Sequence, residues 1–202
     1  MQVWEQSPAT IQDNIIVGEL QASTADHAPA GGRSVIRGNR VSGINFQGPA
    51  LIEGNEIRIH ELWTEDQPMA IQIMSGQGWV IRDNTISGYD TAIRGWDPLD
   101  EGTIDGNEIV GNFNGIMGAG VATVTDNVLR DHRATALSGY DARSYFEDNV
   151  IEANELGLSY RGDPPTMNGN RICDNAENVR PLRGGDRPDA ATNDICPDDR
   201  SE

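Results

Sequence analysis

The sequence predicts an all-β fold, a single-stranded right-handed parallel β-helix of about eight to nine coils. The main observation is a phrase with fixed slots: an aliphatic or other apolar residue, two residues, asparagine, one residue, and an aliphatic residue. It reads IRDNTI at 81–86 and IDGNEI at 104–109, and it recurs at intervals of 16 to 29 residues. Such a period is typical of a solenoid. The nine phrase asparagines are Asn14, Asn39, Asn55, Asn84, Asn107, Asn127, Asn149, Asn170 and Asn193.

Each period is divided into short segments, and none of them is long enough for a helix of ten or more residues. In one coil, Ile81 and Ile86 point inward on either side of a bend, and SGYD at 87–90 turns the chain. TAIRG at 91–95 forms the next strand, marked by a small residue followed by an aliphatic one. We therefore expect three short strands and three turns per coil, wound right-handed as parallel crossovers nearly always are.

The slot before the asparagine predicts a tight bend. Only Gly and Asp occupy it in the first eight copies, and both tolerate turn and left-handed backbone angles. The asparagine amide carries a donor and an acceptor, so stacked copies can bond up and down the stack. The sequence therefore predicts an asparagine ladder at one turn of every coil.

The length of the chain indicates how many domains it forms, and its net charge indicates which kinds of partner it disfavours. The 202 residues suit a single β-helix domain over 1–202, with repeats at about 11–196 and a short tail at 197–202. The net charge of −17 disfavours nucleic acid and anionic membranes as partners. We expect no membrane insertion, because no stretch approaches transmembrane length. The N-terminal MQVWEQSPAT has neither the basic nor the apolar region of a signal peptide.

The two cysteines lie in equivalent slots. Cys173 and Cys196 each stand three residues after a phrase asparagine, so adjacent coils would place them one strand spacing apart, about 4.8 Å. That separation is within the range a disulfide accepts. A Cys173–Cys196 bond would tie down the last coil and imply an oxidising compartment, so we expect a secreted or periplasmic protein. Two unpaired thiols are the alternative.

The IxxNxI…GI pattern resembles the parallel β-helix repeat family, which includes NosD-like proteins and pectate-lyase-like enzymes that act on polysaccharides. The resemblance covers residues 11 to about 196. It implies an outer groove along one strand face, with function carried by residues that do not repeat. The resemblance to NosD-like proteins also suggests copper as a ligand, but the three histidines of the chain fall in different coils. We therefore predict no metal site from the sequence.

Aromatic residues beside arginines and carboxylates occur where the resemblance puts the groove. Sugar ring faces pack on aromatic rings, and sugar hydroxyls or carboxylates meet Asp or Arg. The candidate substrate-binding residues are Arg94, Trp96, Tyr140, Arg161, Asp163 and, in the insertion at 58–68, Trp63. The candidate catalytic residues are Asp97, Asp100, Asp141 and His132. Ordinary solvated loop residues remain the alternative for all of them.

The insertion at 58–68 has two further interpretations. His60 with Glu61 could serve acid–base work, or the carboxylates could hold calcium. A flap over the shortened preceding coil is equally consistent with the sequence. We expect no required cofactor, with calcium as the one candidate ion.

The stretch RGWDPLDEG at 94–102 resembles the YGFDPHD motif of alginate epimerase β-helices, through Gly95, Asp97, Pro98 and Asp100. The tyrosine and histidine of that motif fall on Arg94 and Leu99, and the chain has no lysine. The resemblance therefore implies uronate binding through Arg94 without the epimerase or lyase reaction. Whether the protein is an enzyme stays open, since other carboxylates could act in a glycosidase.

Two functions follow as hypotheses. The first is an exported β-helix protein that binds or processes carbohydrate, with polyuronate as the candidate polysaccharide. The alternative is a non-catalytic structural or assembly module, or a fragment of a longer β-helix protein. Uncapped strand edges would then support end-to-end or homo-oligomeric stacking.

Overall fold

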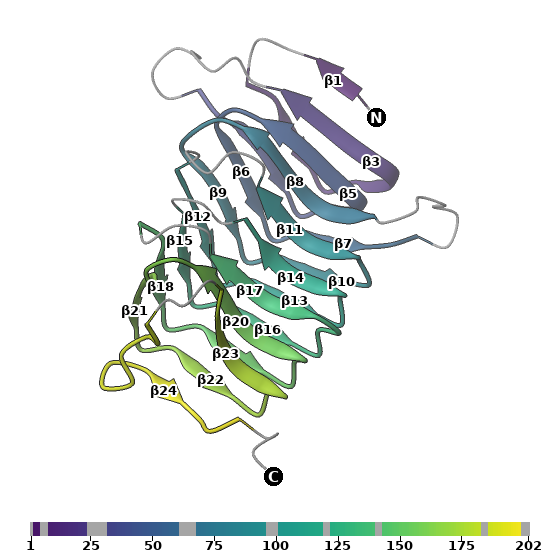
Figure 1. Cartoon of the computed structure of the whole chain (residues 1–202). Coiled ribbons are helices and arrows are strands. Elements are labelled where there is room, and N and C mark those ends of the chain that lie inside the picture. The colour runs from purple at the N-terminus through teal and green to yellow at the C-terminus, as the bar shows by residue number, and fades with distance from the viewer. Residues whose placement is uncertain are drawn as a thin grey trace.

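The computed structural model describes residues 2–4, 8–23, 32–60, 68–95, 101–118, 122–139, 143–182 and 186–198. It confirms an all-β parallel solenoid. The strands form two sheets, of 16 and eight strands, in which the described neighbours pair in parallel. Figure 1 shows the coils stacked along one axis, from the N-terminal β1 at one end to β24 at the other.

The strands lie on three faces of the stack. The eight-stranded sheet comprises β2 (Thr10–Gln12), β4 (Ser34–Arg37), β6 (Ala50–Glu53), β9 (Trp79–Arg82), β12 (Gly102–Asp105), β15 (Thr123–Thr125), β18 (Tyr145–Glu147) and β21 (Thr166–Asn168). The second face comprises β7 (Glu56–Arg58), β10 (Thr85–Ser87), β13 (Glu108–Val110), β16 (Val128–Arg130), β19 (Val150–Glu152), β22 (Arg171–Cys173) and β24 (Asp194–Ile195). The third face comprises β8 (Met69–Ser75), β11 (Thr91–Gly95), β14 (Asn114–Met117), β17 (Thr135–Gly139), β20 (Leu156–Arg161) and β23 (Glu177–Leu182). At the N-terminal end, β1 (Gln2–Trp4), β3 (Ile15–Ser23) and β5 (Arg40–Gln47) complete the 16-stranded sheet.

The stack has about seven turns, slightly fewer than the eight to nine coils predicted. The eight-stranded sheet ends at β21, so only seven steps join its members. The last phrase, at 190–195, adds a turn and the two-residue β24 but no strand to that sheet. Counting phrases overestimated the turns because the terminal copy is an incomplete coil.

Inward aliphatic side chains stack in register to form one continuous core. In the eight-stranded sheet, Ile36 pairs with Ile52, Ile52 with Ile81, and Ile81 with Ile104, and all four are buried. Burying one such side chain contributes about 1.5–3 kcal/mol. The fixed apolar slots of the repeated phrase are therefore the slots that make the core.

The predicted asparagine ladder is confirmed over all nine phrase asparagines. Each backbone N–H from Asn14 to Asn170 donates to the Oδ1 of the next asparagine at 2.9–3.1 Å. The Nδ2 of Asn84 also donates to the carbonyls of Ile52 and Arg82, at 2.9 Å each. The eight Gly or Asp residues before the asparagines have φ between 52° and 66°, the left-handed bend that their slot predicted.

A second ladder, which the sequence analysis did not identify, runs along the next corner of the coil. The N–H of Tyr89 donates to Asn112 Oδ1, that of Asn112 to His132 Nδ1, that of His132 to Asn154 Oδ1 and that of Asn154 to Asn175 Oδ1, at 2.9–3.2 Å. These residues stand five positions after a phrase asparagine, and each follows a residue with φ between 57° and 88°. The recurrence of Gly, Ala or Asp before Asn at this spacing is the signal that could have revealed the ladder.

The backbone of the next coil and the second ladder together leave no room for a larger residue at two glycines of the third face. A Cβ at Gly115 would lie 2.2 Å from the Ala136 carbonyl oxygen and 3.0 Å from His132 Nε2. A Cβ at Gly157 would lie 2.7 Å from the Asn178 carbonyl oxygen and 3.0 Å from Asn175 Nδ2. Glycine at these positions is therefore a packing requirement, set first by the neighbouring carbonyl and then by the ladder side chain.

His132 is a buried, neutral member of this ladder. Only 2% of the residue is exposed, and its Nδ1 accepts the Asn112 N–H, so the ring proton resides on Nε2. Burial lowers the pKa of His132 to about 4, against a smaller opposing effect of backbone groups and the Asp131 carboxylate. The folded chain thus holds this imidazole uncharged at pH values where an unfolded chain would protonate it.

The sheet forks at β5, at the shortened coil. β5 pairs with β7 through Arg40 and Val41 and with β8 from Ile44 onward, so its two halves continue on different faces. Inside the fork, the Tyr89 hydroxyl donates to the Ser42 carbonyl at 2.5 Å. Burial raises the pKa of Tyr89, which keeps the hydroxyl protonated as a donor.

The predicted disulfide is also confirmed. Cys173, at the end of β22, is bonded to Cys196, and the two Cα atoms are 4.9 Å apart, close to one strand spacing. The Cys196 N–H donates to the Ile172 carbonyl at 3.1 Å. The bond therefore holds the last described coil against the one before it.

We predict that His132→Asn removes part of the acid sensitivity of the fold. An imidazole with pKa 6.5 unfolded and about 4 folded leaves stability intact above pH 6.5 and loses it as pH falls toward 4. Between pH 7 and pH 5 the wild type should lose about 2 kcal/mol more than the variant. Urea denaturation at both pH values measures the difference, and equal losses in the two proteins would contradict the prediction.

We predict that Tyr89→Phe destabilises the fork. The change leaves the buried Ser42 carbonyl without the Tyr89 hydroxyl, at a cost of about 1–3 kcal/mol in the free energy of unfolding. Tyr145→Phe is the control, because the Tyr145 side chain is only partly buried and bonds to Glu147 at the surface. Chemical denaturation of both variants tests this, and a Tyr145→Phe loss as large as that of Tyr89→Phe would rule it out.

Candidate functional site

The third face carries one outward row of side chains in register. Gln72 lies beside Arg94, Arg94 beside Met117, and Met117 beside Ser138, and the row continues to Ser159 and Arg180. Ser138 and Ser159 are buried although they point outward, whereas Arg94 and Met117 are half-exposed. Access along this row is therefore open at Gln72, Arg94 and Met117 and again at Arg180, with the two buried serines between them.

A hollow of about 350 Å³ opens at Arg94 and Met117, between β11, β14 and the turn before β11. Its lining includes an acceptor, a donor and an apolar group: Asp90, Arg94 and Met117. Thr91 and Asn114 add polar surface. The hollow thus offers opposite charges and a thioether within one small volume.

Hydrogen bonds between coils hold the rim of this hollow. The Asp90 carbonyl accepts the Asn114 N–H at 2.8 Å and Asn114 Nδ2 at 3.3 Å. A Cβ at Gly95 would lie only 2.8 Å from the Gly118 carbonyl oxygen, so this side of the hollow admits no side chain without a shift. The sequence analysis missed Asn114 as a site residue, since it neighbours Thr91 only through the strand register.

The other predicted binding residues are distributed differently. Arg161, at the end of β20, lies beside Leu182, and Asp163 is exposed in the turn that follows. β14 and β17 separate β20 from β11, and Arg161 stands two residues beyond the row of Arg94. The structure therefore places Arg94 in the hollow and places Arg161 and Asp163 elsewhere on the face.

Several predicted residues lie outside the described part of the chain. These are Trp63, Trp96, Asp97, Asp100, Tyr140 and Asp141. The epimerase-like stretch is therefore described only at Arg94, Gly95, Glu101 and Gly102. The roles of the undescribed residues remain predictions.

His132 is corrected from a candidate catalytic residue to a residue of the scaffold. Its side chain is inside the second ladder, and its Nδ1 already accepts a backbone hydrogen bond. The imidazole is therefore buried, and its acceptor nitrogen is occupied by the hydrogen bond within the second ladder. The sequence could not show this, because a histidine replaces asparagine in only one copy of the corner among Asn112, His132, Asn154 and Asn175.

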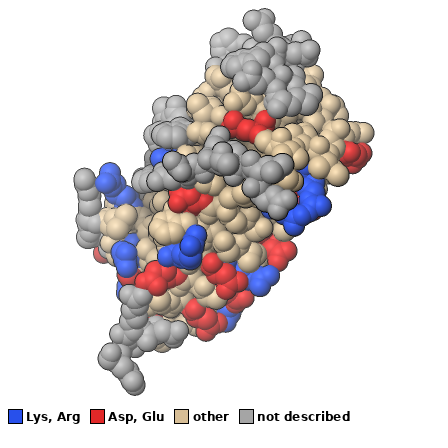
Figure 2. Space-filling view, turned by 90° about the vertical axis from the view of Figure 1, so that its right-hand side faces the viewer, with Lys and Arg blue, Asp and Glu red and all other residues tan. Residues whose placement is uncertain are grey.

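Charged groups of both signs are interspersed over the surface. On the second face, Arg130 pairs with Glu108 and Arg171 pairs with Glu152, each at 2.8 Å. Figure 2 shows blue and red groups side by side on the visible face. The net charge of −17 therefore does not produce a uniformly negative surface on that side.

The metal-donor groups of the described residues were compared with what copper and calcium require. One group of three close donors is found in these ranges: Cys173, Asp194 and Cys196. Both of its sulfurs are joined in the disulfide, and copper favours free thiolate, thioether or imidazole ligands. The His, Cys, Asp and Glu side chains of the described residues therefore do not form a group that fits copper, and they offer no carboxylate cluster of the kind calcium needs.

Comparison with known proteins gives the family. Within the described ranges, no helix is long and apolar enough to cross a membrane. A search of curated proteins found no match. The family model described as periplasmic copper-binding protein (NosD) matches residues 7–186. Since this match covers most of the 202 residues, the chain belongs to the NosD family of β-helix proteins.

Proposed function

We propose that this NosD-family chain binds an acidic polysaccharide, with the hollow at Arg94 as its contact site. The observation that carries the proposal is the joint placement of Asp90, Arg94 and Met117 around one hollow on the strand face. This is the face on which the β-helix resemblance places the groove. A polyuronate, which carries hydroxyls and one carboxylate on each sugar unit, fits the available groups best.

The chemistry of the hollow suits an acidic sugar. The Arg94 guanidinium can donate two parallel hydrogen bonds to a uronate carboxylate, and the Asp90 carboxylate can accept from neighbouring hydroxyls. Hydrogen bonds to charged groups contribute about 1.5–3 kcal/mol each. The Met117 thioether gives the apolar side of a sugar ring a surface to pack on.

The described residues favour binding without turnover. A guanidinium stays protonated, so Arg94 cannot act as a general base where the epimerase motif has tyrosine. The buried His132 is not available for proton transfer at the hollow. The mechanism is therefore recognition: Arg94 fixes the carboxylate, and the fixed rim at Asn114 limits how a sugar can lie.

An extracytoplasmic location supports this assignment. The Cys173–Cys196 disulfide persists in oxidising compartments, and the family description is periplasmic. The description also names copper, for which the described donors do not form a site, so no step of the proposal runs through copper.

The structural-module alternative has one observation in its favour. Among the described strands, β2 pairs only with β4, so one of its edges has no strand partner. Open edges recruit further strands. A module of this kind would form concentration-dependent oligomers in sedimentation velocity and bind no glycan.

We predict that Arg94→Gln weakens oligouronate binding about tenfold or more, the equivalent of about 1.4 kcal/mol. Arg37→Gln is the control, because Arg37 bonds to Gln12 on the opposite sheet. Calorimetric titration with oligouronates and with neutral oligosaccharides measures both. Equal affinities of the two variants for oligouronate, or no binding of oligouronate at millimolar concentration, would contradict the proposal.

A further inference from the structure

A second hollow, of about 480 Å³, lies beside the fork of β5 and is bordered by β3, β5 and β7. We propose that it binds a small organic carboxylate that carries an apolar group, such as a medium-chain aliphatic acid. The hollow lies near the N-terminal end of the stack, away from the Arg94 hollow on β11 and β14. The proposal concerns a different ligand and does not depend on the polysaccharide.

One side of this hollow is apolar and open to solvent. Ile15 is 78% exposed and Val17 is 55% exposed, whereas the other isoleucines and valines whose side chains the structure describes are buried or half-buried. Ile16 and Val41 continue this apolar side toward the core. Covering Ile15 and Val17 with a ligand would remove apolar area from water at about 25 cal/mol per Å².

The other side of the hollow is cationic. Arg40 and Arg58 both pair with the same carboxylate, Glu56, through Nε–Oε1 distances of 3.5 and 3.1 Å. One carboxylate cannot use all the donors of two guanidiniums, which carry five N–H groups each. The side chains of Arg40 and Arg58 stay 44% and 52% exposed, and none of the residues that line the hollow is acidic.

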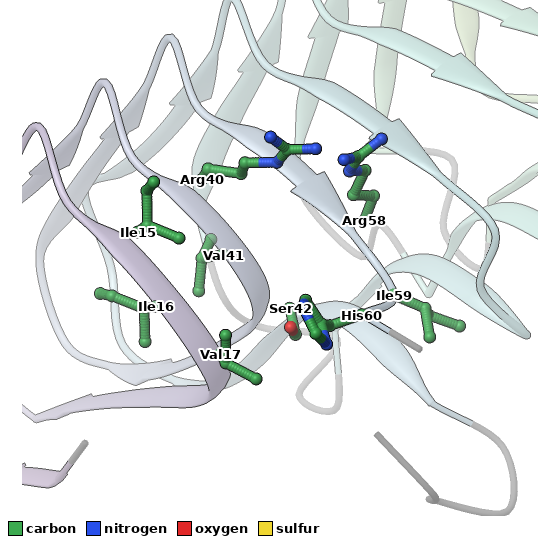
Figure 3. A pocket seen from close by; sticks show the side chains of 9 residues that line it. All are labelled: Ile15, Ile16, Val17, Arg40, Val41, Ser42, Arg58, Ile59 and His60. Atoms are coloured by element: carbon green, nitrogen blue, oxygen red, sulfur yellow. The ribbon is translucent and has the colours of Figure 1, made fainter. Parts of the chain in front are cut away.

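The two kinds of side chain line the same hollow. Figure 3 shows the Arg40 and Arg58 guanidiniums side by side, Ile15 and Val41 further along on β3 and β5, and Val17 beyond them on the side of Ser42 and His60. An anion in the hollow would meet the guanidiniums while an attached alkyl group lies on the aliphatic side. A hydrophilic anion would leave Ile15 and Val17 exposed, and a neutral alkane would leave the guanidinium donors unused.

The hollow exists because the repeat is broken here. In β3, the register with β5 shifts between Ile16 and Glu19, so the bulge at Val17 carries its side chain out of the regular row. In β5, the partner changes from β7 to β8 after Val41, which opens the sheet at Ser42. The Tyr89 hydroxyl bonded to the Ser42 carbonyl fixes this opening from inside.

The volume limits the ligand to a small molecule. Pockets of about 300–1,000 Å³ hold drug-sized ligands. A fatty acid and the C-terminus of an apolar peptide share the required chemistry, a carboxylate next to an apolar group. Octanoate and acetyl-trileucine acid represent the two sources, and the tighter binder identifies the source.

The test is calorimetric titration of the full oxidised chain with octanoate, acetate and octanol. Octanoate should bind at least tenfold more tightly than either acetate or octanol, because only octanoate engages both sides of the hollow. Arg58→Gln should weaken octanoate binding at least tenfold, and Ile15→Ser should weaken it at least threefold. Both side chains are substantially exposed, so neither change empties the core.

Arg130→Gln is the matched control, since Arg130 pairs with Glu108 on the second face and does not line this hollow. It should bind octanoate like the wild type. Equal weakening by Arg58→Gln and Arg130→Gln, or acetate binding as tight as octanoate binding, would overturn the proposal. If Arg58→Gln melts at a lower temperature, Arg40→Gln repeats the test, and oligouronate binding should be unchanged in both variants.

Discussion

Buried side-chain amides are the interaction on which the rest of this structure depends. Each inner asparagine amide of the first ladder donates to a carbonyl of the previous coil and to the Oδ1 of the next asparagine, as Asn107 does with Ile81 and Asn127. Several, including Asn107, also donate to the carbonyl two residues earlier in the same coil. A buried amide left unpaired costs about 1–3 kcal/mol. A slip of one residue between coils would unpair many amides together, so the ladder sets the register of all three faces.

The two ladders also determine where the chain can depart from its repeat. The first-ladder asparagines from Asn14 to Asn170 and the second-ladder residues from Tyr89 to Asn175 each follow a residue with positive φ, so the geometry of these corners tolerates little change. In the part of the chain that the structure describes, no such ladder is found at the turns between the third face and the eight-stranded sheet, and the intervals between these strands vary in length. Both hollows border an irregular stretch: one beside β11, where the chain leaves its strand, and one at the fork of β5. A rigid scaffold with variable turns is a common arrangement for binding proteins.

Surface ion pairs contribute little to the stability of this protein, and we propose that its charges act mainly in recognition. The arginines pair mainly with exposed carboxylates of neighbouring strands, and such surface pairs contribute about 0–1 kcal/mol each. In a chain of net charge −17, a place where arginine faces solvent without a lining carboxylate stands out. The hollow of Arg40 and Arg58 is such a place, whereas the Arg94 hollow combines both signs. Two sites of different charge character suit ligands of different polarity.

The sequence by itself determined the periodic features: the solenoid, the first ladder, the bend before each asparagine and the Cys173–Cys196 pair. Each of these depends on residues at equivalent positions of the repeat, so it can be read from the linear sequence. It also predicted that Arg94 faces outward on the strand face. Only the tertiary structure decided what depends on register between unlike coils. That set includes the burial of His132, the bond from Tyr89 to Ser42 and the meeting of Asp90 with Asn114. The second ladder is an intermediate case, because its members recur five residues after a phrase asparagine but differ in residue type. The bond from Tyr89 to Ser42 joins coils that an irregular turn separates, and no repeat in the sequence records which side chains such a turn brings together.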